Sequence, residues 1–412
     1  VGSSAASDVY KRQLLNRRIF QNVALYFYAF SINFESIDVL GRGLEGTFSI
    51  SRLAGILYLI LILPSFLIFF SIKKSFYFLW PMFVFIILLT IVSIININSF
   101  SSRVIDIAFL LNFFIFIGIL NHAQKDNLVL DKALLVYSFG AIIPAMSIFL
   151  GFGESMLYKD DVVRTVVFGA NSNDLAIKLA IAIIVLGVHV IFNPLKITKF
   201  RYLIFPLIFI LFIALLSTAS RTGILALIAA PFIWLILKTI TSENKLYSFA
   251  SGIFLSIIIL LPIIYIALQS SSLVSRFSLI GDGNFGGREV LWVAYAIMIS
   301  ENFLFGYGLS GTDLVTFQYF GYGGETPHNI ILQILIYAGI PGLIFFFLFL
   351  FRIFKASYIT YKNTGILLPA LLASPLLGYF MLTQSISEKI VWIMMAYICL
   401  LYTSDAADDP TC

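Results

Sequence analysis

Three short segments of the chain combine residue types that could bind an anion or move a proton. The first is Ser220-Arg221-Thr222-Gly223, a polar break between two apolar stretches. An arginine beside lipid is energetically costly, so ionisable residues in such places are commonly functional. The alternative is a turn arginine that extends its long side chain to lipid headgroups. The sequence alone leaves these two interpretations of Arg221 equally open.

The second segment runs from Gly286-Gly287-Arg288-Glu289 through Trp292 to Gly306-Tyr307-Gly308. Apolar residues recur at helical spacing within 288–301, which predicts an amphipathic helix along the membrane interface. Arg288 falls in its first turn, where backbone N–H groups could join the guanidinium in binding an anion. A basic residue there opposes the helix dipole, which argues against a purely structural role. A surface helix without a ligand is the alternative.

The third segment is Thr326-Pro327-His328-Asn329, which leads into an apolar stretch interrupted by Gly339-Ile340-Pro341-Gly342. Histidine is the side chain best suited near neutral pH to take a proton from a substrate hydroxyl. The alternative is that His328 is only a polar residue at the start of a helix. Pro341 should kink that helix.

Other polar residues give weaker signals. The stretch Asn171-Ser172-Asn173 precedes a span and contains residues typical of helix caps. Asp174 and Lys178 are four residues apart on one helical face and could neutralise each other. We expect His122 in a cytoplasmic connection and His189 within an apolar stretch, as a core residue or an interfacial ligand. The sequence shows no metal-ligand cluster, no nucleotide-binding segment and no need for a cofactor.

The elements that position these segments must be membrane helices. Of the 412 residues, 60% are hydrophobic and 11% charged, and the mean hydropathy is +1.00. Soluble domains carry about 25% charged residues. This composition excludes a soluble enzyme and a nucleic-acid-binding module. It predicts an all-α polytopic membrane protein, a fold with about 12 transmembrane helices of about 20 residues each.

The predicted helices are the apolar stretches of the sequence. They lie near residues 19–33, 50–72, 75–97, 104–121, 131–152, 172–192, 200–217, 221–240, 247–268, 328–354, 364–384 and 387–402. We therefore divide the chain into transmembrane helices 1–9 (14–268), one large loop (269–327) and transmembrane helices 10–12 (328–401). The ends, 1–13 and 402–412, resemble translated adapter sequence and are expected to be non-native tails. Cys399 and Cys412 both fall in the segment 399–412, which includes the second end, so we expect no disulfide.

Lysine and arginine segregate between alternate connections. If the chain starts in the cytoplasm, the cytoplasmic connections hold eleven lysines and five arginines. The outer connections then hold two lysines and seven arginines. The positive-inside rule places the large loop outside the cytoplasm. Arginine presents a planar fork that binds phosphate oxygens in pairs, so the outer face should take an anionic, phosphorylated ligand. Arg164 and Arg276 belong to this outer set, and we include them with Trp292 and Asn329 as candidate substrate-binding residues.

The order of these motifs resembles the O-antigen ligase / O-antigen polymerase superfamily of bacterial surface-polysaccharide enzymes. The resemblance rests on Ser-Arg-Thr-Gly at 220–223, Gly-Arg-x₃-Trp at 287–292, Gly-x-Gly at 306–308, Pro-His-Asn at 327–329, Gly-Ile-Pro-Gly at 339–342 and Gly-Ala-Asn-Ser-Asn at 169–173. It covers most of 50–390.

The resemblance implies a metal-independent glycosyltransferase in the bacterial inner membrane, with its active site facing the periplasm or exterior. Such an enzyme moves glycan from an undecaprenyl-pyrophosphate carrier to a hydroxyl of lipid A core or of a growing polysaccharide. By analogy, Arg221 and Arg288 would hold the pyrophosphate, and His328 would activate or orient the acceptor. Ligase and polymerase share these motifs. A flippase for lipid-linked oligosaccharide is the alternative, although a transporter should carry its ionisable residues near mid-membrane.

Overall fold

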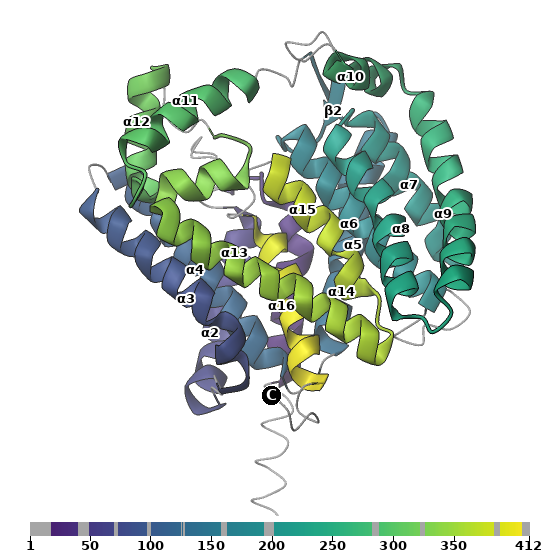
Figure 1. Ribbon diagram of the computed structural model, residues 1–412, viewed down its shortest axis with the longest axis horizontal. Helices are drawn as coiled ribbons and strands as arrows, with labels where there is room; N and C mark the ends of the chain where they lie inside the picture. Colours follow the sequence, from purple (N-terminus) through teal and green to yellow (C-terminus); the bar gives the residue numbers. More distant parts are fainter. Residues whose placement is uncertain are drawn as a thin grey trace, which may run out of the picture.

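The structure is a computed structural model that describes most of the chain. The described residues are 18–39, 49–69, 73–96, 100–124, 126, 128–157, 163–192, 202–281, 288–321, 326–382 and 388–405. The expected tail at 1–13, the segment Gly286-Gly287 and the last seven residues of the chain lie outside this set. The described chain is almost entirely helical (Figure 1).

One group of helices forms the half of the molecule that is drawn in teal in Figure 1. It comprises α5 (Leu128–Phe149), α6 (Ser172–Phe192), α7 (Ile204–Ser217), α8 (Arg221–Thr241) and α9 (Lys245–Leu268). Helix α6 contacts α5, α7 and α8. A helix that is apolar all round is typical of a protein interior. Among the long apolar helices of the described chain, α6 is the most buried.

The other half contains a helix at 18–31, the short turn η1 (Ile32–Phe34), and three further helices. These are α2 (Ile50–Phe69), α3 (Lys73–Ile95) and α4 (Phe100–Ala123). The long α13 (Ile330–Thr364) packs along α3, and α16 (Lys389–Asp405) lies between α4 and α13. Residues 389–401 of α16 are all buried, including the free Cys399, so α16 is a central core helix.

The twelve predicted spans each overlap a helix, but the structure does not establish twelve crossings. In the described part, five helices are long and apolar enough to cross a membrane, namely α5, α6, α8, α9 and α13. Six shorter apolar segments lie in α2, α3, α4, α7, α14–α15 and α16. The predicted span 364–384 is divided, since α14 (Leu368–Leu371) and α15 (Ala373–Leu382) are separate helices and α13 extends to Thr364.

The predicted kink in the 328–354 span is present, but it lies at Gly339, two residues before Pro341. Gly339 has a non-helical backbone (φ 60°, ψ −161°). The break exposes the Ile336 carbonyl, which accepts the N–H of Tyr307 at 2.7 Å. A Cβ on Gly306 would lie 2.7 Å from that same carbonyl oxygen. The Gly-x-Gly and Gly-Ile-Pro-Gly motifs therefore meet, because only glycine permits this close backbone contact.

The predicted loop 269–327 contains three helices in its described part. These are α10 (Ser271–Gly281), α11 (Arg288–Glu301) and α12 (Gly308–Phe320). The predicted helix at 288–301 is confirmed as α11, but its orientation differs from the prediction. Tyr295 and Met298, which lie on the apolar face of this helix, are fully buried in a cluster with Val315 of α12 and Ile336 of α13. This face packs against protein because two further helices lie over it.

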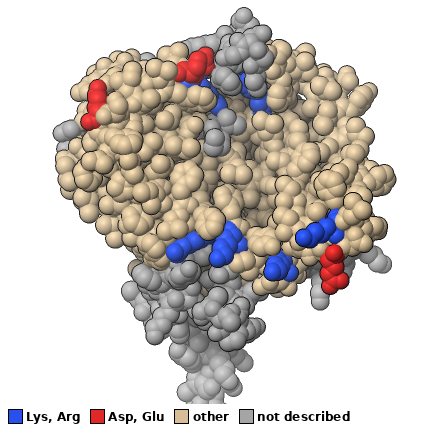
Figure 2. Space-filling model, viewed as in Figure 1, with Lys and Arg blue, Asp and Glu red and all other residues tan. Residues whose placement is uncertain are grey.

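A β-hairpin departs from the all-α prediction. Strands β1 (Glu154–Leu157) and β2 (Val163–Val166) pair antiparallel, with Met156 opposite Arg164. The run of β-branched residues at 162–167 favours a strand and could have indicated it. On the face shown in Figure 2, Lys and Arg side chains gather near two opposite edges, and the broad band between them carries no charge. That distribution is typical of a protein that crosses a bilayer.

Candidate functional site

Arg164 comes from the hairpin that joins α5 to α6. It lies on β2, where burial alternates along the strand, and it is 7% exposed. In a strand, successive side chains point to opposite faces, so the position of Arg164 in β2 turns its side chain inward. The hairpin therefore carries a charge into the molecule beside the start of α6, which β2 contacts.

Arg221 is the first residue of α8. The preceding Ser220 occupies the N-cap position, but its hydroxyl donates to Asn173 Oδ1 of α6 at 2.8 Å and makes no cap hydrogen bond. The first N–H groups of α8 are thus not satisfied by that side chain, which leaves the positive end of the helix suited to an anion. Gly223 lies against α6, where a Cβ would be 2.8 Å from that of Ala176. Close packing of α6 and α8 fixes the position of Arg221.

Arg276 of α10 and the turn before α8 hold each other. Arg276 Nη1 donates to the Ala219 carbonyl at 2.6 Å, and Arg221 Nη1 donates to the Arg276 carbonyl at 3.0 Å. Arg276 is 5% exposed although most of α10 faces outward. The two arginines thus join α8 to α10 through reciprocal hydrogen bonds.

Arg288 begins α11 and lies within the electrostatic field of other cations. Burial lowers its pKa from the ordinary value, and the nearby charges of Arg221 and Arg164 lower it further. An arginine nevertheless stays charged in proteins. We call Arg164, Arg221, Arg276 and Arg288 the arginine cluster. It gathers positive charge from β2, α8, α10 and α11, and such a concentration favours an anionic ligand.

His328 lies beside this cluster, immediately before α13. Burial, and then the positive charge of Arg288, lower the pKa of His328 to about 4. The imidazole is therefore neutral near pH 7 and able to accept a proton. Its Nδ1 atom is buried and makes no hydrogen bond to any described residue.

Trp292 and Asn329 position the segment that carries His328. Trp292 Nε1 donates to the Pro327 carbonyl at 2.9 Å, which connects α11 to the residue before His328. Asn329 caps α13, and its Oδ1 accepts the N–H groups of Ile331 and Leu332 at 2.9 and 3.4 Å. Both side chains have structural partners.

Three residues other than glycine have left-handed backbone in the described chain, and each lies within four residues of a helix start. They are Phe168 before α6, Ala219 before α8 and His328 before α13, with φ of 58°, 49° and 47°. This conformation costs an L-residue roughly 1–2 kcal/mol. Such strain concentrates at functional sites, where surrounding contacts hold it in place.

A second cluster of charges, which we call the acid–lysine cluster, comprises Glu35, Asp174, Lys178, Glu388 and Lys389. Lys178 Nζ forms ion pairs with Glu35 and, at 2.6 Å, with Asp174, and Glu388 is 4.0 Å away. Lys389 pairs with Glu35 at 2.8 Å. The predicted Asp174–Lys178 pair is confirmed. The other members come from segments more than a hundred residues away in sequence, so no local pattern could indicate them.

The protonation of the acid–lysine cluster follows from its geometry. Burial alone raises the pKa of Glu35, but Lys178 and Lys389 outweigh it and hold that pKa well below the usual range. Burial, with the charges of Asp174 and Glu35, holds the pKa of Glu388 well above its usual range. Two lysines thus lie among three carboxyl groups. In the described residues, the three acids also form a group of potential metal ligands within 4.8 Å of one another, which the sequence did not indicate.

The other histidines have structural partners. His122 lies at the end of α4, not in the predicted connection, and its Nδ1 contacts the Tyr58 hydroxyl at 3.1 Å. His189 Nδ1 lies 2.8 Å from the Val185 carbonyl in the core, as predicted.

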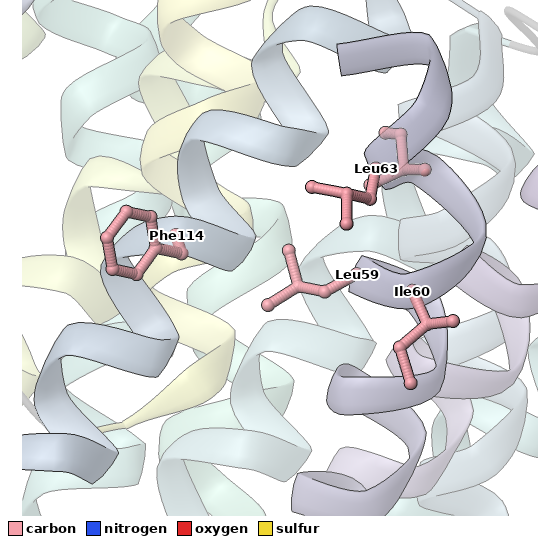
Figure 3. Close-up of a pocket in the computed structure, with 5 residues that line it drawn as sticks. Leu59, Ile60, Leu63 and Phe114 are labelled. Atoms are coloured by element: carbon pink, nitrogen blue, oxygen red, sulfur yellow. The ribbon is translucent and has the colours of Figure 1, made fainter. Parts of the chain in front are cut away.

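An apolar cavity of about 230 Å³ differs chemically from the arginine cluster (Figure 3). Its walls are Leu59, Ile60, Ile62 and Leu63 of α2 and Phe114 of α4. None of these side chains can bind an anion or move a proton, so this cavity has no part in the candidate chemistry.

The structure brings together the residues that the sequence singled out. Hydrogen bonds or electrostatic coupling link Arg164, Arg221, Arg276 and Arg288 to one another and His328 to Arg288. Asn173 and Ser220, which hold the turn before Arg221, were not predicted as partners. Their hydrogen bond joins segments 47 residues apart.

Comparison with known proteins supports the resemblance. Residues 206–347 match the sequence profile of a family described as O-antigen ligase. This segment contains Arg221, Arg276, Arg288 and His328, whereas Arg164 lies before it. No curated protein matches the chain. Residues 206–347 are thus similar to the O-antigen ligase family, and this similarity suggests a membrane glycosyltransferase-like role in polysaccharide assembly.

Proposed function

We propose that this protein transfers a glycan from an undecaprenyl-pyrophosphate carrier to an acceptor hydroxyl at the outer face of the bacterial inner membrane. The acceptor would be lipid A core or a growing polysaccharide. The observation that carries this proposal is the convergence of Arg164, Arg221 and Arg288 beside the neutral His328. A pyrophosphate leaving group needs positive charge, and the acceptor needs a base.

The arginine cluster would stabilise charge as the reaction proceeds. The acceptor oxygen would form a bond to the anomeric carbon of the glycan, and the bond from that carbon to the carrier's phosphate oxygen would break. The departing undecaprenyl pyrophosphate takes the bonding electrons, so its negative charge grows. Guanidinium groups and the start of α8 could bind these oxygens with charge-assisted hydrogen bonds. This role needs no metal ion.

His328 would take the proton from the acceptor hydroxyl. In the ligand-free protein its pKa of about 4 makes it a weak base. A bound pyrophosphate would oppose the field of Arg288, and an opposite charge nearby raises the pKa of a histidine. The donor would thus convert His328 into a stronger base only when the reaction can occur.

The proposed function also implies a membrane topology. We infer that the helix at 18–31 and the six shorter apolar segments cross the membrane with the five longer helices, and that 269–327 lies outside the cytoplasm. Both clusters of charge would then lie near the outer surface. Trp292, Asn329 and Arg276 would line or support the substrate site.

Deletion of the gene tests the function. Lipid-linked and surface glycan should be separated on gels from the deletion strain and from strains carrying the wild-type gene. If the protein is a ligase, long glycan should accumulate on its carrier at the outer face. If it is a polymerase, single repeats should appear on the acceptor.

A flippase predicts a different result from the same deletion. Carrier-linked glycan would then stay on the cytoplasmic side, where an impermeant glycan-modifying enzyme added outside could not reach it. That outcome would contradict the transfer proposal.

A further inference from the structure

Arg276 carries a guanidinium that could bind phosphate, but its hydrogen bonds hold other parts of the protein in place. Its guanidinium is buried and donates to the Ala219 carbonyl at 2.6 Å. Its own carbonyl accepts a hydrogen bond from Arg221. A guanidinium committed to a protein carbonyl has fewer donors left for a ligand.

The peptide that Arg276 holds is under strain. Ala219 has a left-handed backbone, with φ of 49°. The next residue is held as well, because the Ser220 N–H donates to Thr218 Oγ1 at 3.3 Å and its hydroxyl donates to Asn173. Strained backbone persists only where neighbouring groups hold it. Arg276 supplies the hydrogen bond to this strained residue from α10.

The direction of the Ala219 peptide determines where α8 begins. Arg221 is two residues further along and is the first residue of that helix. Rotation of the Ala219 peptide would redirect the start of α8 and with it the Arg221 guanidinium, which lies near enough to Arg288 to lower its pKa. The clamp therefore fixes the spacing of two cations from different elements.

We propose that Arg276 is a positioning residue, which holds the turn 219–221 so that Arg221 and Arg288 face one pyrophosphate. This inference rests on the proposed function. It revises the expectation that Arg276 itself binds substrate.

A double-mutant cycle on the full-length protein in lipid vesicles tests the proposal. Inorganic pyrophosphate would be the probe, with its inhibition constant measured against a lipid-linked glycan donor. The variants are Arg221→Gln, Arg276→Gln and the double variant. Ser275→Ala is the matched control, because this exposed neighbour on α10 donates its hydroxyl to the Ser272 carbonyl of the same helix.

Residues that act through one another give non-additive effects. Either single variant should weaken pyrophosphate inhibition by about 10-fold, the range of a charge-assisted hydrogen bond. The double variant should be no weaker than Arg221→Gln within about threefold. Ser275→Ala should match the wild type. An effect of the double variant equal to the product of the single effects would mean that Arg276 is an independent ligand, and would overturn the proposal.

Arg276→Lys gives a second criterion if Arg276→Gln fails to fold. One ammonium can still donate to one carbonyl, so this variant should keep most of the affinity for pyrophosphate. Arg221→Lys should not, because lysine lacks the paired donors of a guanidinium. Equal losses in the two lysine variants would contradict the clamp. If Arg221→Gln leaves inhibition unchanged, the proposed function itself fails.

Discussion

In the proposed reaction, His328 takes the proton of the acceptor hydroxyl. A histidine with a low pKa in the free protein stays neutral, and so able to accept a proton, over a wide pH range. The pH dependence should therefore differ between free and bound protein, since kcat/KM reports groups of the free enzyme and kcat those of the complex.

We predict that His328 titrates near pH 4 without ligand, against about 6.5 for an ordinary histidine. Below that pH it becomes charged and can no longer accept a proton, so kcat/KM should fall there. Addition of inorganic pyrophosphate should raise the pKa of His328, because the anion offsets Arg288.

NMR of protein with labelled histidine side chains measures this pKa directly. His328→Gln identifies the signal against those of His122 and His189. A signal that titrates near pH 6.5 and does not respond to pyrophosphate would separate His328 from the anion site.

At the scale of elements, the break in α13 at Gly339 holds the segment between α11 and α12 in place. Tyr307 and the residues before it enter the gap at Gly339, and α11 with its Arg288 packs on the same helix. The position of Arg288 thus depends on backbone contacts that lie ten or more residues away from it.

Gly339→Ala should destabilise the protein more than Gly365→Ala. Both glycines have positive φ, of 60° and 72°. A Cβ at 339 would collide with the backbone of Leu304 and Phe305, whereas a Cβ at 365 meets nothing within 4 Å. Gly365→Ala should cost about 1–2 kcal/mol for its backbone alone. Thermal unfolding in detergent compares them, and equal midpoints would show that the contact at Gly339 does not constrain the fold.

The acid–lysine cluster makes a separate contribution to stability. It joins the end of the first described helix to the starts of α6 and α16. Removing one partner of a buried ion pair costs about 3–5 kcal/mol, because it leaves buried charge without compensation.

Lys178→Met should therefore lower the thermal midpoint strongly, and Lys178→Met with Glu35→Gln should recover part of the loss. Lys132→Met on the exposed side of α5 is the control and should change little. If the two lysine variants unfold at the same temperature, the cluster does not stabilise the fold.

Sequence reasoning succeeded where the signal was local. Long apolar stretches predicted the helices, and single arginines in polar breaks predicted the residues that the fold gathers. It failed where the partner was distant, as with Glu35 and Lys389, which are 354 residues apart. It also failed on the surroundings of the apolar face of α11, because helical spacing shows that a face is apolar but not whether lipid or protein covers it.

At the scale of the whole molecule, the proposed topology places the two ends of α9 on opposite sides of the membrane. Helix α9 has 24 residues, enough to span about 36 Å at about 1.5 Å per residue. The arginine cluster lies at the end where α10 follows.

Single cysteines test this arrangement in a background of Cys399→Ala and Cys412→Ser. Ser271→Cys, just after α9, should react in intact cells with a maleimide that cannot cross the inner membrane. Glu243→Cys, just before α9, should react only after the membrane is opened. The reverse pattern would place the arginine cluster in the cytoplasm and exclude an outer active site.

The central claim is that the arginine cluster promotes departure of a lipid pyrophosphate. The most direct measurement is transfer by the purified protein in vesicles, with lipid-linked glycan as donor and released carrier pyrophosphate quantified beside the product. The wild type should form both in equal amounts. Arg288→Lys should lower kcat/KM by about 10- to 100-fold, the equivalent of about 1.5–3 kcal/mol of lost charge-assisted hydrogen bonding. Lys355→Gln, at the far end of α13, should retain the wild-type rate. Transfer that is unchanged in Arg288→Lys, or absent in the wild type with every substrate tested, would contradict the account.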